Sequence, residues 1–425
     1  MWLEQRVLQQ VGRRLSDQQI PLRVVLWNGE SHELGPQPKV DLHLKSPRAV
    51  RHFLRPNLDR LGEAYVEGEI DIRGPLEQTL HIAEALCPGT GKGRTRPLLS
   101  HLIHRHSRQR DAESIQRHYD ISNDFYALWL DRNMVYSCAY YRSGQEDIHQ
   151  AQEQKLDHIC RKLRLQPGEQ FLDIGCGWGA LIVWAARHYG VRATGVTLSQ
   201  GQYQHARQRI REEGLEGQVE VRLQDYRDIP GDAIYDKIAS VGMFEHVGIK
   251  QLPVYFASIQ RLLKPGGLVL NHGITTCDPD PRHAGVDADS FIHRYVFPNG
   301  ELAHLSLVLN ALERQDLETL DVESLRLHYA KTLMHWVSRL DAQQSRALEL
   351  AGERSFRIWR IYMAASAHAF LRGWISIYQV LATRQETSGL VRHPWTREYQ
   401  YANPMAHNQP EEELQAAASS QPLPM

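Results

Sequence analysis

The chain has 425 residues, which is enough for two domains or for one large domain with an appendage. Apolar residues make up 42% and charged residues 23%, the proportions of an ordinary soluble globular protein. The formal net charge of −1 gives no reason to expect a nucleic-acid partner, so any electrostatic attraction has to come from local clusters.

The cysteines and the apolar segments bear on the compartment. Five cysteines, an odd number without a CxxC pair, make a disulfide framework or a zinc knuckle unexpected, and we predict no metal site. The first residues, MWLEQRVLQQVGRRL, lack the continuous apolar core of a secretory signal, and no segment approaches the ~20 apolar residues of a membrane span. We therefore expect a cytoplasmic location.

The N-terminal stretch has the spacing of an amphipathic helix, because Leu3, Val7, Val11 and Leu15 recur every four residues. Docking on the protein's own core is a simpler explanation than insertion into a membrane. Short strand-like runs, turns and helix-like runs then follow one another: LRVVLW, NGE, VDLHL, SPRAVRHFLR and GEAYVEGEIDIRG. This mixture predicts a small α+β domain over residues 1–90.

Residues 91–117 form a basic segment with few acids. Its cations are Lys92, Arg94, Arg96, Arg105, Arg108 and Arg110. Such a run is usually a solvated, mobile linker. At an anionic lipid surface, however, each basic residue would add about 1 kcal/mol of attraction. Both interpretations stay open at this point of the chain.

Residues 118–141, HYDISNDFYALWLDRNMVYSCAYY, mix aromatic and polar groups without a simple period. They are either a packed irregular connection or a lid, in which Tyr136, Ser137 and Cys138 offer hydrogen bonds to a ligand.

Residues 171–179, FLDIGCGWG, read as a short buried strand that breaks into a glycine turn before a helix. Gly175 and Gly177 let the backbone approach a ligand, and the free N–H groups of the helix start favour an anionic or hydrogen-bonding one. The competing interpretation is a dinucleotide site. The spacing here is GxGxG, however, and the acid expected about 20 positions on is missing.

Strand and helix signals alternate from residue 169 onward, which predicts a largely parallel sheet with helices on both faces. We expect strands at 169–175, 192–198, 219–225, 235–241 and 267–273, and helices near 179–189, 199–213 and 250–263. Ligands bind beyond the carboxyl ends of such strands. After the glycines, the residues that follow each strand are Thr197, Leu198, Gln202, Asp225, Tyr226, Glu245, His246, His272 and Ile274.

Two features lie nearer the C-terminus. A stripe with helical spacing predicts first a core face and only second a lipid-facing wall: Phe356, Trp359, Met363, Phe370, Trp374, Ile377 and Leu381. The last residues, 403–425, are polar and proline-flanked, which favours a disordered tail.

Several motifs follow one another over roughly residues 118–381: LDIGCGWG, GVTLSQGQ, LQDYRD, SVGMFEHVG, FIHRYVFPNGELAHLS, HYAKTLMHW and RIWRIYMAASAHAF. In this order they resemble the family of cyclopropane-fatty-acyl-phospholipid synthases and mycolic acid cyclopropane synthases. The first 90 residues also resemble the N-terminal domain of the bacterial phospholipid enzymes. The resemblance implies a class I S-adenosylmethionine-dependent methyltransferase fold, with a mostly parallel seven-stranded sheet and a smaller N-terminal α+β domain. The catalytic domain would span residues 118–402.

The resemblance implies S-adenosylmethionine at the glycine turn. Gly175 and Gly177 would lie against its methionine moiety, held from above by Tyr136 and Ser137. Thr197, Leu198 and Gln202 would meet the ribose, with Gln202 in place of the usual carboxylate. Tyr226 would flank the adenine, and Asp225 would lie nearby.

The implied reaction is methylene transfer to the cis double bond of an unsaturated phospholipid acyl chain. An alkene is a poor nucleophile, so it needs a strong methyl donor held in line, and methyl transfer leaves a carbocation that must lose a proton for the ring to close. The implied base is a bound bicarbonate ion. Glu245 and Tyr329 would orient it, His272 would help hold it, and Cys138 and Ile274 would contribute backbone contacts.

The alternatives to these roles stay open. His272 on its own suits a satisfied core histidine, Cys138 a small buried residue, and Tyr329 a packing tyrosine. Phe244, Phe291 and Tyr295 are candidates for lining the acyl tunnel. The enzyme could also methylate without closing the ring, or the chain could be a non-catalytic lipid- or cofactor-binding protein. A phospholipid substrate favours peripheral contact of residues 92–110 with the inner face of the membrane, and a homodimer is possible.

Overall fold

The computed structural model describes residues 21–54, 56–87, 122–279, 291–296, 301–386, 388–389 and 393–401. The predicted N-terminal helix, the basic segment 91–117 and the tail 403–425 lie outside these ranges. Among the described residues, no helix is both long enough and apolar enough to cross a membrane.

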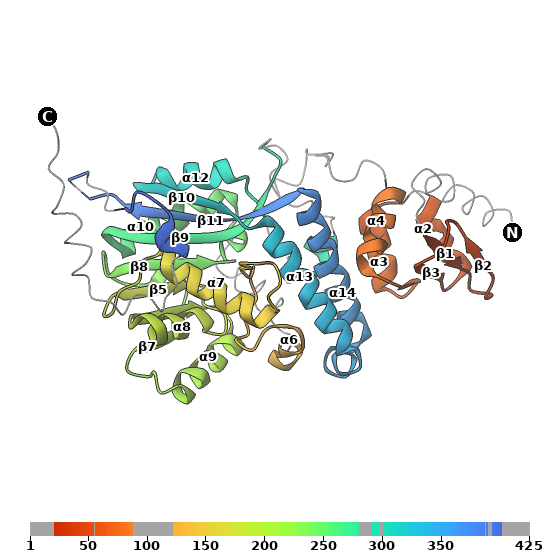
Figure 1. Cartoon of the computed structure of the whole chain (residues 1–425), viewed down its shortest axis with the longest axis horizontal. Coiled ribbons are helices and arrows are strands. Elements are labelled where there is room, and N and C mark those ends of the chain that lie inside the picture. Colours follow the sequence, from red (N-terminus) through yellow and green to blue (C-terminus); the bar gives the residue numbers. More distant parts are fainter. Residues whose placement is uncertain are drawn as a thin grey trace.

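The larger part of the molecule is built on a seven-stranded sheet (Figure 1). Its strands are β5 (Gln170–Ile174), β6 (Arg192–Thr197), β7 (Val219–Leu223), β8 (Tyr235–Val241), β9 (Leu263–Thr276), β10 (Leu317–Ser324) and β11 (Ile375–Arg384). They lie in the order β10-β11-β9-β8-β5-β6-β7. In this sheet β11 pairs antiparallel with both β10 and β9, and the other pairs are parallel. All five predicted strands are present.

Helices cover both faces of this sheet because neighbouring strand residues alternate between two cores. Phe171 and Ala239 pack with α7 (Ile148–Lys162), α8 (Ala180–Tyr189) and α9 (Gln200–Glu212). Leu172 and Ile238 pack on the other face with α10 (Leu252–Leu262) and α12 (Leu305–Glu313). Three further helices stand beside the sheet: α6 (Asn123–Trp129), α13 (Arg326–Ala342) and α14 (Gln344–Arg372).

The N-terminal part is the expected small α+β unit. Its four-stranded sheet has the order β2-β1-β3-β4, with bounds β1 (Leu22–Val25), β2 (Ser31–Glu33), β3 (Val40–Leu44) and β4 (Ile70–Arg73). Its helical segments are η1 (Pro47–Val50), α2 (Arg51–Leu54), α3 (Leu58–Val66) and α4 (Leu76–Leu86). Alternating residues such as Leu22, Val24, Leu42 and Leu44 are buried under these helices.

The N-terminal unit is joined to the rest of the molecule through α14 (Figure 1). Arg357 of α14 donates to the backbone oxygen of Tyr65 at 2.9 Å, and its guanidinium lies 4.9 Å from the centre of the Tyr65 ring. Arg360 reaches the Tyr65 hydroxyl at 3.2 Å. One hydrophobic core runs from the N-terminal sheet through α14 to α6 and α13.

Two sequence predictions need correction. The apolar stripe is not one helix, because α14 ends at Gly373, whose φ of 70° is left-handed, and Ile377 and Leu381 lie on β11. The second correction concerns the start of β9, which was predicted at residue 267. A helix does end before residues 264–267, as predicted, but β9 already begins at Leu263 and contains these residues. Its pairing with β8 shifts register between Tyr235 and Lys237.

The remaining short helices are η3 (Tyr226–Asp228), η4 (Phe244–His246), η5 (Ile249–Gln251), α11 (Phe291–Tyr295) and α15 (Glu398–Tyr401). Of these, η3 and η4 immediately follow β7 and β8, at the carboxyl edge of the parallel strands.

Candidate active site

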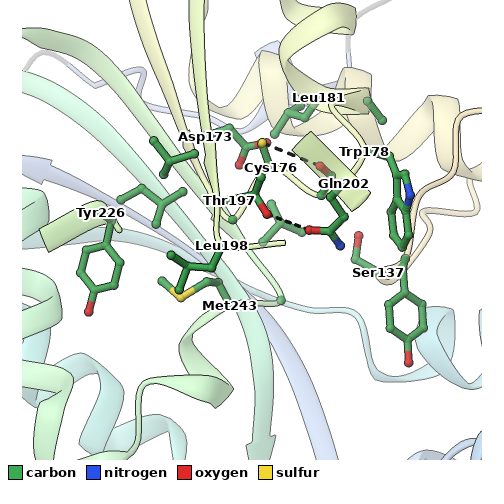
Figure 2. A pocket seen from close by; sticks show the side chains of 18 of the residues that line it. Ser137, Asp173, Cys176, Trp178, Leu181, Thr197, Leu198, Gln202, Tyr226 and Met243 are labelled. Carbon is green, nitrogen blue, oxygen red and sulfur yellow. Dashed lines mark hydrogen bonds between the residues drawn. The ribbon is translucent and has the colours of Figure 1, made fainter. Parts of the chain in front are cut away.

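Two adjoining cavities open at the carboxyl edge of the parallel strands. The first, here called the glycine-turn cavity, is lined by all of the residues expected at the cofactor: Tyr136, Ser137, Gly175, Gly177, Thr197, Leu198, Gln202, Asp225 and Tyr226. Figure 2 labels five of them among the side chains that line this cavity: Ser137, Thr197, Leu198, Gln202 and Tyr226. The sequence prediction that these positions converge on one cavity agrees with their placement.

The glycine turn depends on backbone conformations that other residues avoid. Gly175 and Gly177 have φ angles of 82° and 54°. A Cβ on Gly175 would lie 2.9 Å from Cγ of Met243, so a side chain there would also displace a cavity wall. The backbone of Gly177, in contrast, has open space where a side chain would begin, on the side where a ligand would lie.

Gln202, the residue expected to meet the ribose, lies in the wall of this cavity. Thr197 Oγ1 donates to Gln202 Oε1 at 2.8 Å, which fixes the amide and leaves its nitrogen pointing away from Thr197 (Figure 2). Asp225 is paired with Arg227 at 2.6 Å, and Tyr226 packs edge-on against Tyr255. The cavity wall thus offers an amide donor and an aromatic ring beyond the glycine turn.

Two charged residues that the sequence analysis did not single out lie in the same wall. Asp173 and Lys155 are 3% and 2% exposed, and Asp173 Oδ1 has no hydrogen-bond partner among the described residues. Burial raises the pKa of Asp173 to about 7 and lowers that of Lys155 to about 8, although the two charges oppose these shifts. The sequence could have indicated Asp173, because it lies inside the motif LDIGCGWG. No sequence pattern indicated Lys155.

The segment from Val135 to Cys138 lies between the two cavities, and side chains of α7 hydrogen-bond to it. Gln152 donates to the backbone oxygen of Ser137 at 2.9 Å, and Lys155 donates to its hydroxyl at 3.0 Å. These two residues are three apart, so they lie on one face of the helix. The aromatic-rich segment is therefore an ordered wall, with Tyr136 and Ser137 lining both cavities.

The second cavity, here called the Glu245 cavity, brings together the five residues expected to hold the bicarbonate: Cys138, Glu245, His272, Ile274 and Tyr329. It shares Tyr136, Ser137, Gly242 and His246 with the first. The rest of its wall is mostly apolar and comes largely from α13, α14 and β11: Leu302, Leu333, Tyr362, Ser366, Phe370, Ile375 and Ile377. Phe370 and Ile377 belong to the apolar stripe, whose second interpretation was a lipid-facing wall.

Glu245 is a buried carboxyl at the base of this cavity. Its Oε1 accepts the backbone N–H of Ile274 at 2.7 Å, whereas Oε2 has no partner among the described residues. Burial raises the pKa of Glu245 to about 7, because hydrogen bonds from the backbone, that of Ile274 first, only partly offset the loss of water. A carboxyl in this state is poised to interact with a further polar group.

His272 faces the cavity as a neutral imidazole. Burial drives its pKa well below the usual value, with Lys155 and Lys162 acting in the same direction. The amide nitrogen of Gln379 lies 3.1 Å from Nδ1. With this amide as the donor, Nδ1 is the acceptor and the proton is on Nε2. Nε2 has no partner among the described residues, so it is a donor available to a ligand.

The other three residues differ in what they offer. Tyr329, on α13, packs against Phe370 at 4.9 Å between ring centres. Ile274 contributes its N–H to Glu245. Cys138 is fully buried, and its thiol lies 3.2 Å from the oxygen of Ala139 and 3.8 Å from that of Leu325. Burial raises its pKa, which agrees with a structural thiol rather than a nucleophile.

The three candidates for the acyl tunnel line neither cavity. Phe244 packs over Gly273, where a Cβ would lie only 1.8 Å from its ring. Phe291 packs over Gly62 of α3, and its N–H donates to Asp59 at 2.8 Å. The ring of Tyr295 lies 4.8 Å from that of Phe291, tilted by 42°. The short helix that carries both residues, α11, contacts α3 of the N-terminal unit.

Comparison with known proteins identifies the family. Residues 106–380, well over half of the chain, match the family described as mycolic acid cyclopropane synthetase. The chain belongs to this family. Residues 13–85 match a second family, described only as a domain of unknown function (DUF7884). Family membership makes the chain an S-adenosylmethionine-dependent methyltransferase and confirms the predicted fold.

Individual relatives span most of the chain. A probable fatty acid methyltransferase of Pseudomonas putida is 44% identical over 397 residues, 93% of this chain and 100% of the relative. The cyclopropane-fatty-acyl-phospholipid synthase of Escherichia coli strain K12 is 36% identical over 361 residues, 82% of this chain and 89% of the relative. The crystal structure of a mycolic acid cyclopropane synthase complexed with SAH and CTAB is 33% identical, with a TM-score of 0.60 over 64% of this chain and 98% of that one.

Proposed function

We propose that this member of the mycolic acid cyclopropane synthetase family transfers a methylene group from S-adenosylmethionine to the cis double bond of an unsaturated phospholipid acyl chain. The product is a cyclopropane acyl chain. The observation that carries the proposal is the pairing of cavities: a polar one at the glycine turn adjoins a mostly apolar one that contains Glu245, His272 and Tyr329.

The residues present fit the methyl donor. The amino-acid end of S-adenosylmethionine carries an ammonium and a carboxylate, and Asp173 Oδ1 is a buried acceptor without a partner among the described residues. Ser137 is held in place by Lys155 and Gln152 to meet the same end. The amide of Gln202 suits a ribose hydroxyl, and the ring of Tyr226 suits an adenine face.

The second cavity fits a bicarbonate ion. Nε2 of His272 is a buried donor and Oε2 of Glu245 a buried acceptor, and both are unpartnered among the described residues. An anion with its own hydroxyl satisfies both at once, since it accepts from His272 and donates to Glu245. We propose that Tyr329 helps to orient the same ion and that Cys138 and Ile274 contribute backbone contacts around it.

These positions suggest separate roles for the two bound groups and for the protein. When bound, S-adenosylmethionine supplies an electrophilic methyl group and bicarbonate supplies a base. The protein's own part is to align the acyl chain between the cavities, to exclude water with apolar walls, and to keep the base next to the reacting carbons. The aromatic rings of Tyr136 and Tyr362 line the Glu245 cavity and can stabilise developing positive charge in the acyl chain.

A second product remains a candidate because of the relatives' names. The Pseudomonas putida relative and a 40% identical one from Mycobacterium tuberculosis are both described as probable fatty acid methyltransferases. In that alternative the ring does not close. Loss of a proton from a neighbouring carbon of the acyl chain leaves a methyl-branched alkene, whereas a 1,2-hydride shift followed by loss of a proton from the transferred methyl group leaves a methylene product.

One lipid experiment tests the proposal and separates the products. The purified chain is incubated with vesicles of cis-unsaturated phospholipid, S-adenosylmethionine and bicarbonate, and the acyl chains are analysed by mass spectrometry before and after mild hydrogenation. We expect a gain of one CH2 that hydrogenation does not change. A product that takes up hydrogen would identify the methylene alternative, and no gain of CH2 would overturn the enzymatic proposal.

The pKa of Glu245 predicts a pH dependence. A carboxyl that titrates at about 7 is protonated below that pH and then cannot accept the hydroxyl of bicarbonate. At saturating donor and constant bicarbonate concentration, we therefore expect kcat to rise as the pH increases through about 7. If kcat of a Glu245→Gln variant rose with pH in the same way, a group other than Glu245 would cause the pH dependence.

Contact with the membrane surface is part of the proposal. Leu327 and Leu371 are 60% and 45% exposed at the start of α13 and the end of α14, and Arg326 bridges these ends by donating to the backbone oxygens of Phe370 and Leu371. The same helices carry Tyr329 and Phe370 of the Glu245 cavity. We propose that these leucines, with the basic residues 92–110, bring the cavity to the cytoplasmic face of the membrane.

A further inference from the structure

Three potential metal ligands from distant parts of the chain meet between the N-terminal unit and α14. His81 and Glu84 lie three residues apart on α4, and His368 lies on α14. One ligand atom from each of the three lies within 4.8 Å of the other two. This cluster belongs to neither cavity of the active site.

The spacing of the cluster is close to that of a tetrahedral site. Two atoms that bind a zinc ion at about 2.1 Å lie roughly 3.4 Å apart. His368 Nε2 and Glu84 Oε2 are already 3.0 Å apart, so this pair needs almost no movement. The ring of His81 meets that of His368 edge-on at 5.2 Å between centres. Because His81 is exposed, a change of rotamer can close the remaining gap.

The environment orients the ligands. Arg372 lies 2.9 Å from Oε1 of Glu84, so it fixes the carboxylate through the oxygen that does not face His368. The side chain of His368 is only 6% exposed, so packing around the imidazole restricts its movement. The exposed side of His81 gives an ion access from solvent.

We propose that His81, Glu84 and His368 bind a divalent transition-metal ion of the zinc type, with water as the fourth ligand. Two imidazoles and one carboxylate suit zinc, whereas calcium and magnesium prefer oxygen ligands. The ion joins α4 to α14 and so fastens the N-terminal unit to the helix that also carries Tyr362, Ser366 and Phe370 of the Glu245 cavity.

The test uses the full chain, stripped of metal by a chelator and then titrated with Co2+ and Zn2+. We expect one Co2+ per chain with the visible absorption of a tetrahedral site, displacement by Zn2+, and a higher thermal midpoint with Zn2+ than with chelator. His81→Gln and His368→Gln should each weaken binding at least about tenfold and remove the zinc-dependent shift.

The chain offers a matched control. His52, Glu69 and Arg51 repeat the histidine–carboxylate–arginine arrangement in the N-terminal unit, and none of them belongs to the His81–Glu84–His368 cluster. His52→Gln should leave metal binding unchanged. Unchanged binding in the double variant His81→Gln/His368→Gln would overturn the site, because other histidines would then hold the ion. The proposal would also be overturned if the native chain bound no stoichiometric metal and His368→Gln were destabilised equally in zinc and in chelator. The cluster would then be a hydrogen-bonded contact without a metal ion.

Discussion

Replacing Glu245 by glutamine is expected to lower kcat by about a hundredfold, within the range for loss of a proton-transfer arrangement. The amide keeps the volume of the side chain, and its oxygen still accepts the N–H of Ile274. It cannot offer a second acceptor at the position of Oε2. We therefore expect folding and cofactor affinity to stay close to those of the native chain, as measured by thermal unfolding and by titration with S-adenosylhomocysteine.

Glu301 provides the control for this substitution. Its carboxylate also accepts a backbone N–H, that of Ile249 at 2.8 Å, but it lines neither cavity. Glu301→Gln should leave kcat nearly unchanged. If Glu245→Gln turned over like the native chain, the carboxylate would have no part in the reaction, and the non-catalytic interpretation of the Glu245 cavity would have to be reopened.

Gly273→Ala is expected to destabilise the protein by about 3 kcal/mol and to remove most of the activity. The new Cβ would lie 1.8 Å from Cε1 and 2.2 Å from Cδ1 of Phe244, a ring that is only 3% exposed and has little room to move. Displacing Phe244 also displaces its neighbour Glu245 from the N–H of Ile274. Urea unfolding and the lipid assay measure the two effects.

Gly201→Ala is the matched control, because Gly201 lies on α9 and its nearest neighbour to a new Cβ would be 3.9 Å away. It should be neutral or slightly stabilising, since alanine favours a helix. Adding Phe244→Ala to Gly273→Ala should restore part of the stability by making room. A Gly273→Ala protein as stable as the native one would show that Phe244 does not hold Glu245 in place.

Sequence patterns predicted the carboxyl edge of the sheet well, for a physical reason. Parallel strands end at one edge, so polar residues that follow successive strands converge even when they are far apart in the chain. Gly175, Gln202, Asp225 and Glu245 are placed by this rule, which needs only the strand positions. The structure therefore brings together both sets of predicted site residues, although their roles remain proposals.

The apolar stripe shows where periodicity fails. Ile377 and Leu381 are four residues apart, which suits one face of a helix, but four is also an even number and suits one face of a strand. Both residues are buried on β11, where pairing with β9 and β10 decides the conformation. Neither this strand nor β10 was identified by its own pattern; the seven-stranded sheet was implied only by the family resemblance.

Taken by itself, the sequence determined the glycine turn, the positions of five strands along the chain and the family, since these depend on local patterns and on motifs in a fixed order. Only the tertiary structure decided what each side chain experiences. Burial raises the pKa of Glu245, and the amide of Gln379, more than a hundred positions away, is the hydrogen-bond partner of Nδ1 of His272. Contacts between distant segments likewise bring His368 to His81 and Glu84, because desolvation and long-range packing exist only once the chain has folded.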